Sequence, residues 1–205
     1  KTYSFNRTLD AMYLKPVAST YRLIVPPPVR VSAGNFFQNV SEIPTTFNNL
    51  LQTRPRNAGR SIMRFIINST LGVFGLFDIA EEIGIERERT TLADTLVRWG
   101  YHDSIYLVLP IFGPSTTRDA IGRVGNTFME PSYYLNGKYR TKYFIASSIN
   151  VRASLLDLED VIKAASVDEY VFVRNSYLQK RKSLMEPADG SISEDDLQYL
   201  DEPPE

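Results

Sequence analysis

The residues that could do acid–base or nucleophilic chemistry in this 205-residue chain gather around a single histidine. His102 is followed by Asp103 and Ser104, the residue types of a hydrolase triad. Neighbours in sequence cannot usually face one another as triad members do, and no G-x-S-x-G turn is present. The absence of Cys excludes thiol nucleophiles and thiolate metal sites. We therefore expect no catalytic residue, no metal and no cofactor.

Acidic residues could supply acid–base chemistry without a histidine, because two paired carboxylates can act as acid and base. Asp78 and Asp119 could be brought together by folding, but arginine partners are available at Arg64 and Arg118. We interpret all four residues as structural ion pairs. A phosphate-binding loop is also absent, because the Gly-Lys at 137–138 lacks the upstream glycine and the following Ser or Thr.

The formal net charge of -1 hides two unequal parts. Residues 186–205 contain eight acidic and no basic residues, which leaves 23 basic and 16 acidic residues in 1–185. We interpret 1–185 as the folded domain, with a formal charge of +7, and 186–205 as an acidic, disordered tail. A basic body suits a phospholipid surface or a nucleic acid, although a plain solubility tail explains the split equally well. No nucleic-acid-binding motif accompanies the charge, so we expect no nucleic-acid partner.

Two uncharged apolar segments lie at residues 65–77 (FIINSTLGVFGLF) and 104–117 (SIYLVLPIFGPSTT). Both are shorter than the roughly 18–20 apolar residues that a membrane-spanning helix needs. Core helices are the default interpretation, and interfacial membrane segments are the alternative. The 12 Tyr and 11 Phe favour the alternative, since aromatic rings suit boundaries between apolar and wet surroundings.

Hydrophobic spacing predicts a mostly α protein without internal repeats. A first helix is expected to end before Pro16, and the prolines at 26–28 are expected to turn the chain in an extended form. Capping boxes predict helix starts at Thr91, Thr116 and Ser166. Before them, Arg56, Arg60 and Arg64 recur every four residues, which predicts a basic stripe on one helix face. Such a stripe suits a headgroup boundary, although a solvated arginine face on an ordinary helix is the more common cause of this spacing.

An ordered string of short motifs resembles the MlaA (VacJ) family, over roughly residues 5 to 183. Its first half contains FNR at 5–7, PVA at 16–18, PVR at 28–30, NFFQN at 35–39, NLLQ at 49–52, RFIINST at 64–70 and GVFGLFD at 72–78. Its second half contains TL at 95–96, WG at 99–100, YLVLP at 106–110, GPST at 113–116 and RD at 118–119. Each motif is weak alone, but their number and order make the signal strong.

The resemblance implies an all-α, ring-like monotopic arrangement of short amphipathic helices around an amphipathic channel. It implies an outer-membrane lipoprotein that lies in the inner leaflet, on the periplasmic face, and removes misplaced phospholipid from the outer leaflet. The implied partners are phospholipid, a trimeric porin and an MlaC-like soluble periplasmic carrier. The lipidated Cys of the family is absent, so we expect it to precede Lys1 in the full-length protein.

Site residues can be carried over from the resemblance by position. It implies that Asn35 and Phe36 lie in a loop that helps to gate the channel. It also implies that residues 106–112 form a helical hairpin beside the channel, with Leu107, Leu109, Ile111 and Phe112 in contact with lipid or the gate. The sequence departs from the family at 93–94 and 101–105, where the hinge of that hairpin would be stiffer. A membrane-surface phospholipase and a porin-docking structural lipoprotein remain the alternative functions.

Overall fold

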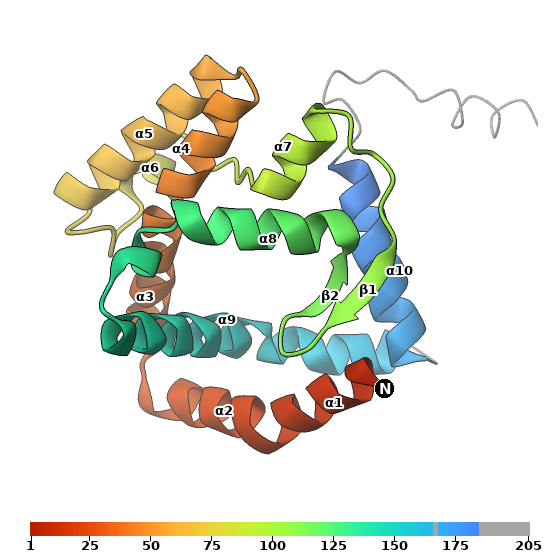
Figure 1. The fold of residues 1–205 in the computed structure, drawn as a ribbon. Helices are drawn as coiled ribbons and strands as arrows, with labels where there is room; N and C mark the ends of the chain where they lie inside the picture. Colours follow the sequence, from red (N-terminus) through yellow and green to blue (C-terminus); the bar gives the residue numbers. More distant parts are fainter. Residues whose placement is uncertain (166–167, 185–205) are drawn as a thin grey trace, which may run out of the picture.

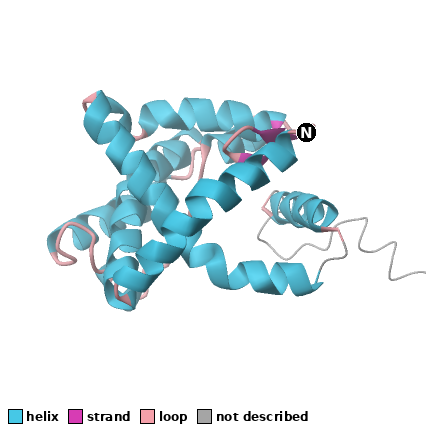
Figure 2. Ribbon diagram, turned by 90° about the horizontal axis from the view of Figure 1, so that it is seen from below, coloured by secondary structure: helices cyan, strands magenta, loops and turns pink. Residues whose placement is uncertain are grey.

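Helices make up most of the protein in the computed structural model, which describes residues 1–165 and 168–184 (Figure 1). Within this part of the chain, strand is confined to one short hairpin (Figure 2). The all-α class expected from the sequence is therefore confirmed, with that hairpin as an exception. The predicted acidic tail, 186–205, lies outside the described residues.

The chain consists of short helices joined by tight turns. Its first half contains α1 (Thr2–Leu9), the π-helix η1 (Asp10–Leu14), α2 (Lys15–Ile24), α3 (Pro27–Val40), α4 (Glu42–Leu51), α5 (Pro55–Thr70) and α6 (Ile79–Glu82). Its second half contains α7 (Leu92–Arg98), β1 (Tyr106–Leu109), β2 (Gly113–Thr116), α8 (Thr117–Met129), the 3-10 helix η2 (Pro131–Tyr134), α9 (Gly137–Ala165) and α10 (Glu169–Ser183). No helix in the described ranges combines the length and the apolar character needed to cross a bilayer.

The helical backbone does not stop before Pro16, because η1 and α2 follow α1 without a break, so the predicted boundary is wrong. Proline in an α-helix lacks an N–H, and its ring clashes with the carbonyl four residues earlier. Here a wider π turn precedes it, in which the N–H of Lys15 donates to the carbonyl of Asp10. α1, η1 and α2 thus form one continuous rod, which packs along α9 and is fixed there by an ion pair of 2.7 Å between Arg152 and Asp10.

Capping residues start two helices where the sequence predicted them. At α7 the N–H of Thr91 donates to Asp94 over 2.8 Å, and at α8 the N–H of Asp119 donates to Thr116 over 3.2 Å. The third prediction is wrong in its residue: α10 is capped by Asp168, whose carboxylate accepts from Val171, whereas Ser166 lies outside the described residues. Asp caps a helix as well as Ser does, because either oxygen can accept the free N–H groups of the first turn.

Residues 106–116 form an antiparallel β-hairpin, so the predicted helical hairpin is wrong. Tyr106 pairs with Thr116, and Leu109 pairs with Gly113. Ile111 in the turn has φ +69°, and Gly113 at the start of β2 has φ +76°, conformations that a helix cannot include. Pro110 within the segment also disfavours a helix, while short runs of Tyr, Leu and Val are well suited to a strand.

The described part of the protein buries small and polar residues and exposes large apolar ones. Its buried apolar side chains are Ala18, Ala58, Ala80, Ala93 and Ala153. The largest fully buried side chains include Arg64, Arg118, Glu42, Asn48 and Asn49. In contrast, Leu23 is 87% exposed and Phe74 is 76% exposed. Large apolar surface of this kind marks a protein that contacts lipid or another protein.

Two helices, α8 and α9, run across the molecule on opposite sides of its centre (Figure 1). α3 lies at one end of the pair, and the β1–β2 hairpin with α10 lies at the other. α9 is 29 residues long, and its first half was not predicted as a helix because polar and apolar residues there follow no clear period. Of these elements, α3, α8, α9 and the hairpin position residues of the candidate site.

Candidate functional site

A cavity of about 1000 Å³ lies between α3, α8, η2, α9 and the turn of the β-hairpin. The helix α3 contributes one wall, from Pro27 to Ser41, and α9 contributes another, from Arg140 to Ser154. α8 and the hairpin turn add Arg123, Thr127 and Phe112. A cavity of this volume is at the upper end of the range found for small-molecule sites.

Aromatic rings form the apolar part of the cavity lining. Phe37 of α3 meets Tyr143 of α9 edge to face, with ring centroids 5.1 Å apart. Phe112 of the hairpin turn meets Phe144 of α9 in the same way, at 6.3 Å. Burial raises the pKa of Tyr143 to about 12, so its phenol is neutral at any physiological pH. These four rings offer an uncharged, apolar surface.

Arginines form the charged part of the lining, and we call the five of them the cationic wall: Arg30, Arg87, Arg89, Arg123 and Arg140. Glu130 is the one carboxylate among the lining residues that the structure describes. Its pKa is raised by burial and lowered to a lesser extent by the charge of Arg89. The cavity is therefore amphipathic, with an excess of positive charge.

The site residues carried over from the resemblance do not all reach this cavity. Asn35 and Phe112 line it, whereas Phe36, Leu107, Leu109 and Ile111 are not among its lining residues. Asn35 and Phe36 lie within α3, so their predicted placement in a loop is wrong. Asn35 does reach the apolar loop after α5, since its amide donates to the carbonyl of Leu76 over 3.3 Å.

The hairpin turn is held in place by Asn6, a residue that the sequence did not single out. Its amide donates to the carbonyl of Leu109 over 2.8 Å, and its side-chain oxygen accepts from the N–H of Ile111 over 2.8 Å. These two hydrogen bonds attach the hairpin turn, which contains Phe112, to the N-terminal rod. The only signal in the sequence was its place in the FNR motif.

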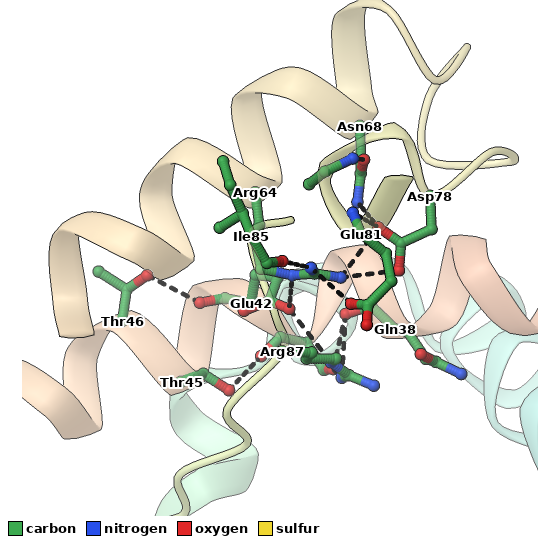
Figure 3. A network of polar contacts seen from close by, with 12 residues as sticks. Gln38, Glu42, Thr45, Thr46, Arg64, Asn68, Asp78, Glu81, Ile85 and Arg87 are labelled. Atoms are coloured by element: carbon green, nitrogen blue, oxygen red, sulfur yellow. Dashed lines mark hydrogen bonds and ion pairs between the residues drawn. The ribbon is translucent and has the colours of Figure 1, made fainter. Parts of the chain in front are cut away.

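Arg64 is the centre of a buried polar network beside the cavity (Figure 3). It pairs with Glu42 at 3.3 Å, with Asp78 at 2.7 Å and with Glu81 at 3.0 Å, and it donates to the carbonyl of Ile85. Arg64 and Glu42 are each only 2% exposed. Arg87 of the cationic wall joins the network by pairing with the same oxygen of Glu42 at 3.1 Å. The network therefore ties the cavity wall to α5.

The predicted basic stripe on α5 is not a free charged surface. Arg64 is buried in the network, and Arg60 pairs with Glu88 at 3.9 Å. Helical spacing places residues on one face, but it cannot tell how much of that face is covered, and here Arg64 is buried while Arg56 is exposed. Arg64 and Asp78, which we interpreted as structural ion-pair residues, pair at 2.7 Å, so Arg64 is not available to a headgroup.

Arg118 and Asp119, which were also predicted as structural ion-pair residues, do not pair with each other. Arg118 donates to the carbonyls of Tyr101 and His102, at 3.2 and 3.0 Å. Asp119 instead pairs with Arg181 and accepts from Tyr177, both on α10. Consecutive helical residues point about 100° apart, which is why the two side chains reach different partners. Asp119 thus anchors the C-terminal helix.

The elements of a hydrolytic site are not assembled around His102. Ser104 is engaged elsewhere, since its hydroxyl accepts from the N–H of Arg118 over 3.0 Å and contacts Thr117. His102 is exposed and is not part of the cavity lining. Among the described residues, no group of three or more His, Cys, Asp or Glu could hold a metal ion.

Taken together, these features define a mostly helical protein with a polar interior, an apolar exterior and an amphipathic cavity. The chain belongs to the MlaA lipoprotein family, whose family model matches residues 1–184. It is 35% identical to a Rickettsia felis protein over 185 residues, which cover 89% of this chain and 74% of that protein.

Two further relatives carry functional descriptions. The chain is 29% identical to the intermembrane phospholipid transport system lipoprotein MlaA of Escherichia coli over 211 residues, covering 97% of this chain and 84% of that protein. It also resembles a solved structure described as the structural basis for maintenance of bacterial outer membrane lipid asymmetry. That similarity has a TM-score of 0.75 at 30% identity, and it covers 89% of this chain and 97% of the other.

Proposed function

We propose that this protein is a passive conduit for glycerophospholipid in an outer-membrane lipid-transport system. It would take misplaced phospholipid from the outer leaflet of the outer membrane and pass it to a soluble periplasmic carrier. The observation that carries the proposal is the cavity of about 1000 Å³, which sets aromatic rings beside a cationic wall. This combination matches the two chemical parts of a phospholipid.

A conduit must spare the headgroup the cost of crossing hydrocarbon. An unsatisfied polar group in an apolar medium costs several kcal/mol, and a charged one costs more. Arg30, Arg123 and Arg140 offer N–H donors to the headgroup, while Phe112 and Phe144 offer a surface to the acyl chains. Such a path lowers a barrier without an energy source, so the direction of transport would come from the partners that remove the lipid.

The exterior of the protein supports a position in the inner leaflet. Leu23 and Ile24 at the end of α2, and Leu71 and Phe74 in the loop after α5, are all at least 70% exposed. Residues 1–185, the proposed folded domain, have the positive charge that favours anionic headgroups. We propose that these apolar surfaces lie in lipid or against a trimeric porin, assisted by a lipid anchor, with 186–205 as an acidic tail in water.

Replacing Phe112 by Asp tests the conduit directly. The new carboxylate would replace an apolar ring of the lining and lie beside Arg123, where it would disfavour acyl chains and compete with phosphate. We therefore expect transfer of labelled phospholipid between membranes to fall at least about tenfold. Phe112→Leu is the matched control, because it keeps an apolar side chain at the same place, and it should retain most of the transfer. Thermal melting must show that both variants are folded.

Unchanged transfer by the folded Phe112→Asp variant would remove the cavity from the transport path. If this variant also still binds the porin, the result would favour a purely structural, porin-docking role.

A further inference from the structure

We infer that Arg30, Arg123 and Arg140 form a phosphate-recognition site, so that the cavity selects lipids by their phosphodiester rather than by their headgroup alcohol. The inference rests on the proposed function and deepens it, because it names the chemical group by which that cavity recognises its cargo.

The first reason is that these three arginines have no carboxylate partner among the residues whose side chains the structure describes. Arg30 is half-buried, and Arg123 and Arg140 are exposed. Elsewhere in that part of the chain, buried or half-buried arginines have protein partners: Arg64 pairs with Glu42, Arg152 pairs with Asp10, and Arg118 donates to backbone carbonyls. Within the cationic wall, Arg87 is paired with Glu42, and the charge of Arg89 lowers the pKa of Glu130. Arg30, Arg123 and Arg140 are therefore available to a ligand.

The second reason is the position of two of these guanidinium groups. Arg123 lies over the ring of Phe112 at 4.9 Å, and Arg140 lies over the ring of Tyr133 at 5.5 Å. A cation–π contact restrains the guanidinium group without supplying an acceptor for its N–H donors. Two arginines held in this way are prepared for the bidentate hydrogen bonds that arginine makes with phosphate oxygens.

The third reason is an unsatisfied donor. The Nε of Arg30 is buried and has no hydrogen-bond partner. A buried donor without an acceptor is costly, so such groups are rare unless a ligand or water completes them. Arg30 lines the same cavity as Arg123 and Arg140, from helix α3. An anionic oxygen in the cavity would supply the missing acceptor.

The arrangement also indicates an amphiphile rather than a free anion. The ring of Phe112 that holds Arg123 also contacts the ring of Phe144 in the apolar part of the lining. A ligand whose phosphate reaches Arg123 would therefore place its next carbons beside Phe112 and Phe144. A glycerophospholipid has this order of groups, whereas inorganic phosphate has only the first of them.

Three small ligands distinguish these sources: dihexanoyl-phosphatidylglycerol, dihexanoylglycerol, which lacks the phosphate, and inorganic phosphate. Calorimetry with the protein of residues 1–205 should show binding of the phospholipid, at least about tenfold weaker binding of dihexanoylglycerol, and no competition by equimolar inorganic phosphate. The double variant Arg123→Gln/Arg140→Gln should bind the phospholipid about 10- to 100-fold more weakly. Arg54→Gln, a surface arginine paired with Glu88 outside the cavity, should bind like the wild type.

Equal affinity for dihexanoylglycerol, or an unchanged affinity in the folded double variant, would overturn phosphate recognition. Equal competition by inorganic phosphate would overturn the assignment to a lipid. Failure here is separable from failure of the conduit. If the double variant transfers phospholipid normally while Phe112→Asp does not, the recognition site is wrong and the conduit stands.

Discussion

Replacing Arg64 by Met is expected to lower the free energy of unfolding by about 3–5 kcal/mol, because it removes one partner of a buried ion network. Met retains much of the apolar volume of the arginine stem, but it leaves Glu42, which is 2% exposed, with Arg87 as its one ion-pair partner. It also removes the ion pair of Asp78 at 2.7 Å. Urea unfolding, followed by circular dichroism, measures the change.

The matched control for this prediction is Arg60→Met, one helical turn earlier on α5. Arg60 pairs with Glu88 at 3.9 Å, and both side chains are more than a third exposed, so the loss should be below about 1 kcal/mol. Similar losses for the two variants would show that the network around Arg64 contributes no more than a surface ion pair. Adding Glu42→Gln to Arg64→Met should recover part of the lost unfolding free energy. It removes a buried carboxylate charge that has lost one of its two arginine partners.

The second large effect is expected at Gly122, where α8 touches α7. A Cβ atom there would lie 2.5 Å from the backbone nitrogen and 2.8 Å from the Cα of Ala93. Neither backbone atom can move without separating the two helices, so we expect Gly122→Ala to destabilise the protein by about 1–3 kcal/mol. Thermal melting and urea unfolding both report this change.

Gly59 provides a control of opposite sign. It lies inside α5, and a Cβ atom there would meet nothing within 4 Å. Gly59→Ala should therefore stabilise the protein by about 0.5–1 kcal/mol, through the lower conformational entropy of the unfolded chain and the better helix propensity of Ala. A loss at Gly59, or no loss at Gly122, would contradict the packing described for these helices.

The local signals of the sequence predicted helices well, because they act over a few residues. Thr91 and Thr116 were found as helix caps from their acidic partners three residues later. The β-hairpin was missed because a short apolar run fits a buried helix and a strand equally well. The rod through Pro16 was missed because the π turn that accommodates the proline leaves no mark in the sequence.

The candidate site was predictable only in part, because its residues come together from distant positions. Asn35 and Phe112 were identified through the resemblance to the family, and both line the cavity. Arg30, Arg123 and Arg140 lie on three different helices, so no spacing rule connects them. Of the three arginines that did follow a helical spacing, Arg64 is buried instead. Periodicity identifies a shared face, but only the tertiary structure shows what covers it.

The most direct test of the central claim is to capture phospholipid inside the cavity. A photoreactive benzophenone side chain would replace Phe144, which lines the cavity, or Phe74, which is exposed on the loop after α5. In membranes with labelled phosphatidylglycerol, we expect lipid adducts at both positions, and the Phe112→Asp change should abolish only the adduct at 144. Capture at 74 but not at 144 in the otherwise unchanged protein would contradict passage of phospholipid through the cavity.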